Sequence, residues 1–222
     1  MKSALITLLA FCLCLPLMGD AAAKKRFEET KVKAENGNEI AQYNLALMYR
    51  KGEGVKQDFK QAVKWFRKSA DQGFTRSQVN LGLMYDKGVG VKQDFKQAHE
   101  WFLKAAELGD TKAQTNIGAS YYKGEGVAQD FKEAYKWYLK AASQGDAIAQ
   151  CSLADLYANG KGIIENYVEA YAWANIATAN GHKLAPRLAH SLLQPKMTPE
   201  QIAKAQKLSR EMIKKNPKLL SK

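Results

Sequence analysis

Residues 41–73 read AQYNLALMYRKGEGVKQDFKQAVKWFRKSADQG, and residues 113–145 restate this pattern as AQTNIGASYYKGEGVAQDFKEAYKWYLKAASQG. The tryptophans of the 222-residue chain fall 36 residues apart, at Trp65, Trp101, Trp137 and Trp173. A bulky, rare residue that recurs at one interval indicates a copied structural unit. Because such a unit buries its apolar face only against its neighbours, the period predicts a solenoid.

Each unit carries the pattern of two helices joined by a glycine-containing turn. One side of the first helix is marked by residues that recur every four positions, at Ala41, Leu45 and Tyr49. Gly52 is expected to end this helix, because glycine accepts the left-handed conformation. Asp58 and Gln61 predict a capping box at the start of the second helix. The later units carry the same signal at Asp94/Gln97, Asp130/Glu133 and Asn166/Glu169.

The second helix of a unit should bury an apolar stripe beside its tryptophan. In the first unit the stripe consists of Phe59, Ala62, Val63, Phe66 and Ala70. The middle of each first helix holds a small residue, at Ala46, Gly82, Gly118 and Ala154. Glycine inside a helix costs about 0.5–1 kcal/mol, so these positions predict the close approach of a neighbouring helix.

The period divides the chain into a leading helix, four units and a tail. Residues 24–36 resemble the second helix of a truncated leading unit. The complete units are expected at residues 37–72, 73–108, 109–144 and 145–181. Residues 182–222 form a basic C-terminal part, in which Thr198 to Gln201 predict the start of an amphipathic helix. That helix should cover the last unit, as the end of a repeat array requires.

Residues 1–23 have the composition of a cleaved signal peptide. A nearly continuous apolar run spans residues 4–18, and small residues follow it, so cleavage is expected after Ala21 or Ala23. The run is shorter than the roughly 20 residues of a membrane span, although a membrane-tethered N-terminus is the alternative. We therefore expect a periplasmic or secreted protein without a membrane span in its mature form. The mature chain would keep only Cys151 and could form no intramolecular disulfide.

The net charge of +12 is concentrated in the C-terminal part. Residues 182–222 hold ten Lys or Arg against two Glu, whereas residues 37–181 hold 18 basic and 16 acidic residues. A basic tail can attract acidic proteins, anionic lipid or cell-wall polymers, or it can simply be a solvated helix face. Nucleic-acid binding is a further use of such charge, but an export signal argues against it.

The spacing A-x-x-x-[LI]-[GA]-x-x-Y-x-x-G-x-G-[VI]-x-x-[DN]-x-x-x-A-x-x-W resembles the Sel1-like repeat, a relative of the tetratricopeptide repeat, over residues 37–181. The resemblance implies an all-α fold, a right-handed α-solenoid of helix-turn-helix repeats with a C-terminal capping helix. It also implies a scaffold or adaptor that holds protein complexes together, in exported bacterial members often in the cell envelope or with host factors. The fourth unit departs from the pattern in its turn, KGIIENY.

In related helical repeats the first helix of each pair lines a concave groove, which suggests a binding surface for a protein or peptide. Asparagine both donates to and accepts from a peptide backbone, so a column of asparagines suits an extended ligand. Arg76 and Lys112 are candidates to hold an acidic side chain or a C-terminal carboxylate. The alternative is that the asparagines bond only within the protein. The groove candidates are Tyr43, Asn44, Arg76, Asn80, Lys87, Lys112, Asn116 and Lys123.

Signals for catalysis are weak in this sequence. There is no His-Glu-x-x-His pattern, cysteine pair or phosphate-binding loop, so no catalytic residue, metal site or cofactor is predicted. His99 takes a position filled by Val63 in the first unit and is expected to pack. Cys151 paired with His182 or His190 is a possible nucleophile, but a half-buried inert thiol is the preferred interpretation.

The expected function is therefore a non-catalytic, monomeric interaction module. The first alternative is a binder of anionic envelope polymers through the basic tail. The second is a β-lactam-binding or hydrolysing enzyme, because some exported Sel1-repeat proteins have been linked to that activity. Those proteins carry a disulfide in every repeat, which this chain lacks.

Overall fold

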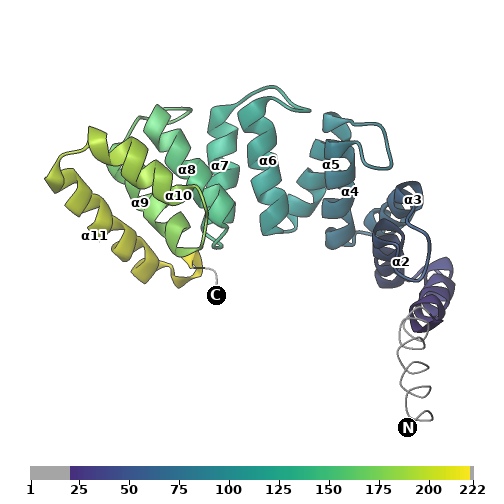
Figure 1. The fold of residues 1–222 in the computed structure, drawn as a ribbon. Coiled ribbons are helices and arrows are strands. Elements are labelled where there is room, and N and C mark those ends of the chain that lie inside the picture. The colour runs from purple at the N-terminus through teal and green to yellow at the C-terminus, as the bar shows by residue number, and fades with distance from the viewer. Residues whose placement is uncertain (1–20, 221–222) are drawn as a thin grey trace, which may run out of the picture. The chain divides into compact units, whose positions relative to one another are not determined.

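The computed structural model describes residues 21–220, and these residues form helices joined by short turns, without a β-strand among them (Figure 1). The chain divides into two compact units, Met1–Asp94 (unit 1) and Phe95–Lys222 (unit 2). The division falls inside the second predicted repeat, between its two helices. The all-α prediction is confirmed.

Unit 1 contains a leading helix over residues 21–35, followed by α2 (Glu39–Lys51), α3 (Phe59–Asp71) and α4 (Thr75–Lys87). The leading helix contacts α2, α2 packs against α3, and α3 packs against α4. The leading helix buries Phe27 and Ala34, and the Phe27 ring meets the Tyr49 ring edge-on with centroids 5.4 Å apart. Leu45 and Phe66 are fully enclosed in the core of this unit.

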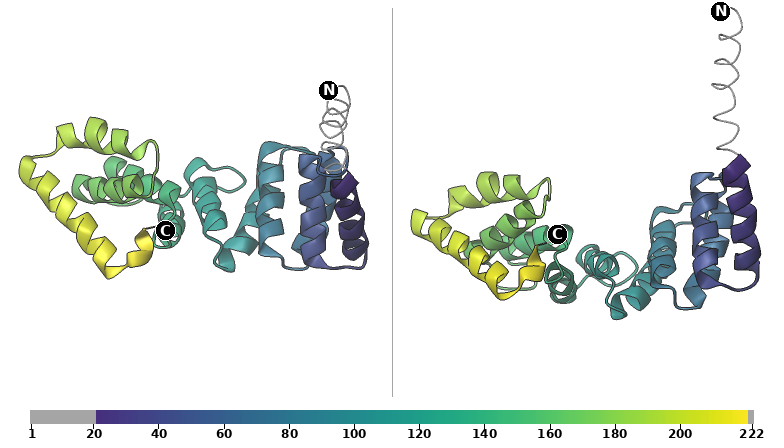
Figure 2. Two further views of the ribbon diagram at one scale, coloured as in Figure 1. Left: turned by 60° about the horizontal axis from the view of Figure 1, so that its bottom comes forward. Right: turned by 90° about the horizontal axis from the view of Figure 1, so that it is seen from below.

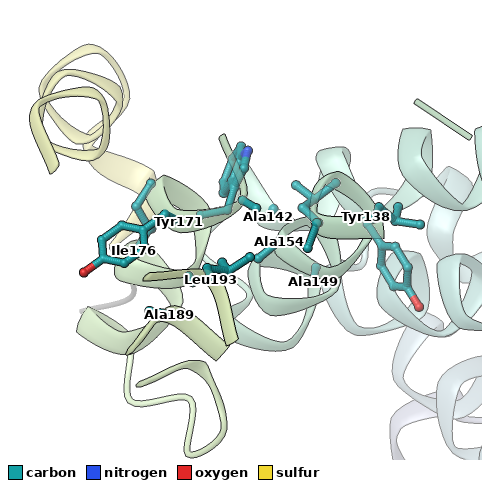
Figure 3. Close-up of a cluster of buried hydrophobic side chains, with 14 of the residues drawn as sticks. Tyr138, Ala142, Ala149, Ala154, Tyr171, Ile176, Ala189 and Leu193 are labelled. Carbon is teal, nitrogen blue, oxygen red and sulfur yellow. The ribbon is translucent and has the colours of Figure 1, made fainter. Parts of the chain in front are cut away.

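Unit 2 continues the same helix–turn–helix pattern and ends in a different structure. Its repeat helices are α5 (Phe95–Glu107), α6 (Thr111–Lys123), α7 (Phe131–Ala142), α8 (Ala147–Asn159) and α9 (Tyr167–Ala179). After them come α10 (Ala185–Arg187), η1 (Leu188–Leu193), η2 (Gln194–Lys196), α11 (Pro199–Lys215) and η3 (Pro217–Leu219). Figure 3 shows how Tyr171, Ile176 and Leu193 join the alanines of the repeats in one buried cluster.

Glycines explain two features of the repeat. Gly52, Gly88, Gly124 and Gly160 end their helices in the left-handed conformation, as predicted. The second glycine of a turn serves close packing: a Cβ atom on Gly126 would lie 2.1 Å from the carbonyl oxygen of Phe95. The mid-helix Gly118 likewise leaves room for the Tyr138 ring, which a Cβ atom there would meet at 2.6 Å. The predicted close approach is confirmed at this position.

In the first, third and fourth units the predicted capping boxes form only in half. The side chains of Asp58, Asp130 and Asn166 accept from backbone N–H groups of the first helical turn, as expected. The reciprocal bond would run from the backbone N–H of the cap residue to the side chain three residues later. In these units that N–H donates instead to a backbone carbonyl near the end of the preceding helix. Asp58 N–H, for example, donates to Tyr49 O at 2.9 Å. The same bond recurs from Asp94 to Tyr85, from Asp130 to Tyr121 and from Asn166 to Tyr157.

The tryptophans lie in closely similar surroundings. Trp65, Trp101 and Trp173 are buried, and Trp137 is half-buried. A lysine three residues later covers the ring in the first three units, with Nζ to ring-centroid distances of 4.3 Å at Lys68, 4.1 Å at Lys104 and 3.9 Å at Lys140. The fourth unit has the fully buried Ile176 at that position. The predicted stripe of α3 is buried except for Phe59, which stays 37% exposed because it starts the helix at the edge of the packed face.

The C-terminal capping helix is confirmed. Thr198 and Gln201 form a complete reciprocal capping box at the start of α11. Helix α11 packs against α9, and the chain then returns to the last repeat, where Leu219 is buried (Figure 2).

The predicted signal peptide lies outside the described residues except for positions 21–23, which begin the leading helix. Among the helices that the structure describes, none has the length and apolar character needed to span a bilayer.

Candidate functional site

The groove candidates of unit 1 divide into internal and exposed side chains. Asn80 accepts a hydrogen bond from Arg50 Nη1 at 2.7 Å and donates to the carbonyl oxygen of Arg76 at 2.8 Å. The Asn80 amide is therefore already occupied within the protein, which was the alternative interpretation. Tyr43 packs its ring against Phe66 and Phe74, at centroid distances of 5.8 and 5.2 Å. Asn44 and the Arg76 side chain are exposed.

The lysines at the ends of the first helices, Lys51, Lys87 and Lys123, are partly neutralised by the turns that follow them. Lys51 lies 3.3 Å from Glu53, and Lys123 lies 3.2 Å from Glu125. The equivalent turn of the second repeat has Val89 in place of glutamate, and Lys87 is exposed. Arg76 in unit 1 and Lys112 in unit 2 are both exposed. Binding of a ligand carboxylate by these two side chains stays a prediction.

Unit 2 contains a depression of about 290 Å³ on the side formed by α6, α7 and α8. Asn116 is half-buried on α6, whereas the depression takes its walls from residues further along the chain. It is lined by Tyr122, Tyr138, Ile148, Cys151, Ser152, Asp155 and His182. Three of these, on α8, occupy positions that match groove candidates of earlier units: Ile148 matches Lys112, Cys151 matches Tyr43 and Ser152 matches Asn116.

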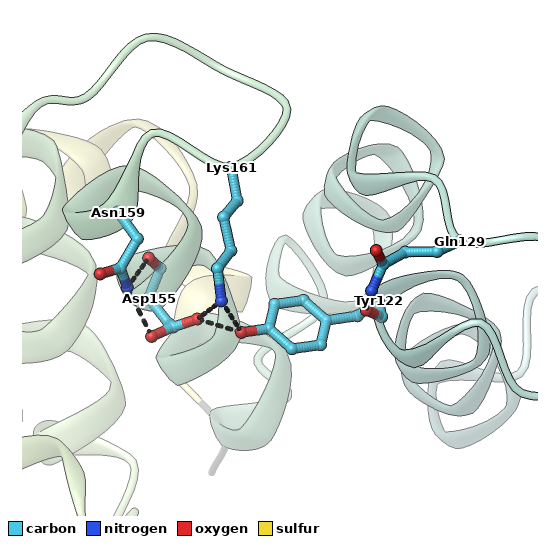
Figure 4. Close-up of polar contacts among 5 residues, drawn as sticks. All are labelled: Tyr122, Gln129, Asp155, Asn159 and Lys161. Carbon is cyan, nitrogen blue, oxygen red and sulfur yellow. Dashed lines mark hydrogen bonds and ion pairs between the residues drawn. The ribbon is translucent and has the colours of Figure 1, made fainter.

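A polar cluster connects two repeats at the edge of this depression (Figure 4). Tyr122 Oη donates to Asp155 Oδ2 at 2.7 Å and accepts from Lys161 Nζ at 2.6 Å. Lys161 Nζ also lies 4.0 Å from Asp155 Oδ2 and 4.7 Å from the centre of the Tyr122 ring. Asn159 Nδ2 donates to Asp155 Oδ1 at 2.8 Å. The Asp155 carboxylate thus has partners on both oxygens.

Sequence reasoning missed this cluster, although a signal for it existed. Asp155 stands where the earlier units have Leu47, Leu83 and Ala119. Lys161 stands where they have Glu53, Val89 and Glu125. Asp155 and Lys161 both depart from the repeat pattern, carry opposite charges and lie next to each other. The cluster is therefore a local feature of the last repeats and not a property of every unit.

Four titratable groups at the depression, Cys151, Tyr122, Tyr138 and Lys161, have raised pKa values. Burial, reinforced by the Asp155 carboxylate, raises the pKa of Cys151 to about 11. Burial raises the pKa of Tyr138 to about 12 and also raises that of Tyr122. The hydrogen bond to Tyr122 raises the pKa of Lys161. A nucleophile or general base needs an available unprotonated form near pH 7, so these four groups are poor candidates for catalysis.

The histidines occupy separate environments. His99 is buried and meets Tyr121 edge-on, and burial lowers its pKa, as suits a packed side chain. His182 lines the depression with Cys151, and its Nδ1 atom is buried without a hydrogen-bond partner among the described residues. His190 lies instead beside Tyr171 and Gln194. Within residues 21–220 no cluster of His, Cys, Asp and Glu is arranged to hold a metal ion.

A family model described as the Sel1 repeat matches residues 40–74, 75–110, 111–146 and 147–182. The chain belongs to the Sel1 repeat family. These matches begin two or three residues after the predicted units, at the helix starts. A putative sel1-like repeat-containing protein, L18 of Acanthamoeba polyphaga mimivirus, is 47% identical over 45 residues, or 20% of this chain and 8% of that protein.

Two solved Sel1 structures resemble the whole repeat array. A Sel1 repeat protein from Oxalobacter formigenes is 32% identical, with a TM-score of 0.74, over 85% of this chain and 79% of the other. A protective antigen of uropathogenic Escherichia coli strains, c5321, is 28% identical, with a TM-score of 0.54, over 89% of this chain and 58% of the antigen. Sel1 repeat proteins are generally protein–protein interaction scaffolds, and their fold is typically non-catalytic.

Proposed function

We propose that this Sel1 repeat protein is a non-catalytic adaptor that binds a protein or peptide on the first-helix side of its repeats. The observation that carries this proposal is the depression in unit 2, which combines aromatic rings, hydroxyl groups and an exposed isoleucine. Such a mixed surface suits side chains and backbone of a peptide. The raised pKa values of its cysteine and tyrosines, and of Lys161 at its edge, favour recognition over chemistry near pH 7.

The proposal includes the place and the ligand type. We infer an exported protein that works in the periplasm or outside the cell, on the basis of the apolar run and small residues at its N-terminus. The ligand class that we favour is an acidic segment or a C-terminal carboxylate. Exposed cations at Arg76, Lys87 and Lys112 support this preference.

The test compares two isoleucine substitutions of the same kind. Ile148 lines the depression and is 58% exposed, whereas Ile164 lies in the last turn and is 90% exposed. Ile148→Glu introduces a carboxylate that repels an acidic ligand from the depression, and Ile164→Glu introduces the same group elsewhere. Affinity capture should lose specific partners with Ile148→Glu and keep them with Ile164→Glu. Identical partner sets for both baits, at equal melting temperatures, contradict binding at this surface.

A further inference from the structure

A second hollow surface lies in unit 1, between the leading helix and α2. The two helices are held together by the Phe27–Tyr49 ring contact and by Gln42 Nε2, which donates to Ala34 O at 3.1 Å. Two depressions, of about 490 and 220 Å³, lie along this seam. Both are lined by Thr30 and Asn44, so they adjoin and form one trough.

The trough carries an excess of positive charge. Arg26 and Lys33 come from the leading helix and Lys51 from α2. Glu53 is the acidic residue on the lining, and it pairs with Lys51 at 3.3 Å. Among the described residues no ion pair involves Arg26 or Lys33, and both side chains are exposed. Two cations are therefore available for carboxylates of a ligand.

The remaining lining suits an extended peptide. Thr30, Asn36 and Asn44 supply a hydroxyl group and two amides, which can bond to the main chain. Ile40 is 51% exposed at the same surface and offers an apolar contact. Residues 26–35 of the leading helix span about 14 Å, at roughly 1.5 Å per residue. An extended segment of about five residues covers this length, at roughly 3.3 Å per residue.

We propose that this trough, defined by Arg26, Thr30, Lys33, Ile40, Asn44 and Lys51, binds an extended acidic segment of a partner protein. Carboxylates of the segment pair with Arg26 and Lys33, its main chain bonds to Asn44 and Thr30, and an apolar side chain rests on Ile40. The inference rests on the proposed adaptor function. It adds a binding role for the leading helix, which the repeat pattern identifies only as part of a truncated unit.

The experiment measures fluorescence anisotropy with a labelled pentapeptide of alternating glutamate and leucine. A pentapeptide of alternating glutamine and leucine is the uncharged control. The trough variant is Arg26→Glu with Lys33→Glu. The matched control is Lys60→Glu with Lys64→Glu, which changes the net charge by the same amount at exposed positions of α3. The melting temperature of every variant is measured alongside the affinity.

The acidic probe should bind more tightly than its glutamine counterpart, and the trough variant should weaken binding at least about tenfold. The α3 control should keep the affinity within about twofold. Asn44→Ala should also weaken the binding, with little change in its salt dependence, because it removes no charge. Equal losses in the trough and α3 variants would indicate general attraction to the cationic protein and would overturn the inference.

Failure of this inference can be separated from failure of the proposed function. If the acidic probe does not bind, or binds equally to the trough variant, the trough is not its site. The Ile148→Glu capture assay then still decides whether the depression of unit 2 holds a partner. If capture is unchanged by Ile148→Glu while the trough variant loses the acidic probe, the trough inference survives and the unit 2 site is rejected.

Discussion

Gln150 donates through Nε2 to the carbonyl oxygen of Leu219 at 2.7 Å and to that of Ala142 at 3.2 Å. The bond to Ala142 is one step of a column that runs through the repeats. Equivalent bonds join Gln42 to Ala34, Gln78 to Ala70 and Gln114 to Ala106. The bond to Leu219 ties the C-terminal segment to the last step of this column.

Gln150→Ala should lower the free energy of unfolding by about 1 to 3 kcal/mol, because it removes two hydrogen bonds made by a buried side chain, each of which contributes about 0.5–1.5 kcal/mol. Gln150 is fully buried, and Asn180 would remain as a second donor to Leu219, at 2.6 Å. Urea denaturation followed by circular dichroism measures the change. Gln206→Ala, at an exposed position of α11, is the control and should have little effect. Equal losses for the two variants would show that the column adds no stability.

Most of the fold could be predicted because it is repeated. Helix ends at Gly52 and its copies depend on backbone conformation alone, so the local sequence is sufficient. The half-formed capping boxes show the limit of local reasoning: the Asp58 N–H has a second acceptor, Tyr49 O, which only the folded turn brings near. Asn80 shows the same limit at the candidate site, because its partner Arg50 lies 30 residues away.

Alanine substitutions at two glycines can distinguish the cost of backbone strain from the cost of steric contact. Gly109 and Gly126 have φ angles of 89° and 77°, but a Cβ atom on Gly109 would meet nothing within 4 Å. Gly109→Ala should therefore lower the free energy of unfolding by about 1 kcal/mol, because alanine disfavours the left-handed conformation. Gly126→Ala should lower it by about 1–3 kcal/mol more, because the Phe95 carbonyl must also move away from the new methyl group. Thermal denaturation of both variants measures the difference, and equal shifts would contradict the packing role of the second glycine.

The pairing of Asp155 with Lys161 can be measured by restoring the residues of the other repeats. Asp155→Leu and Lys161→Glu each return one position to the pattern. Lys161→Glu alone places a second carboxylate beside Asp155, and the double variant removes that repulsion. The unfolding free energy of the double variant should exceed the value expected from adding the two single changes. The difference should be about 0.5–1 kcal/mol, as is typical of a partly exposed pair. Strictly additive unfolding energies would show that the two departures are independent.

The reactivity of Cys151 tests whether the depression holds a usable nucleophile. Its pKa of about 11 has burial as the larger cause and Asp155 as the smaller one. Iodoacetamide should therefore alkylate the folded protein at least about tenfold more slowly at pH 7.5 than the urea-unfolded chain. This factor allows for the greater nucleophilicity of a thiolate with a high pKa, which offsets part of its scarcity. The alkylation rate of the folded protein should keep rising by about tenfold per pH unit up to pH 10, provided that circular dichroism shows an intact fold.

Asp155→Asn should raise the alkylation rate of Cys151 only partly, because burial of the thiol remains. A rate that levels off near pH 8 would mean an accessible thiolate at Cys151, and catalysis by Cys151 with His182 would then need to be tested directly.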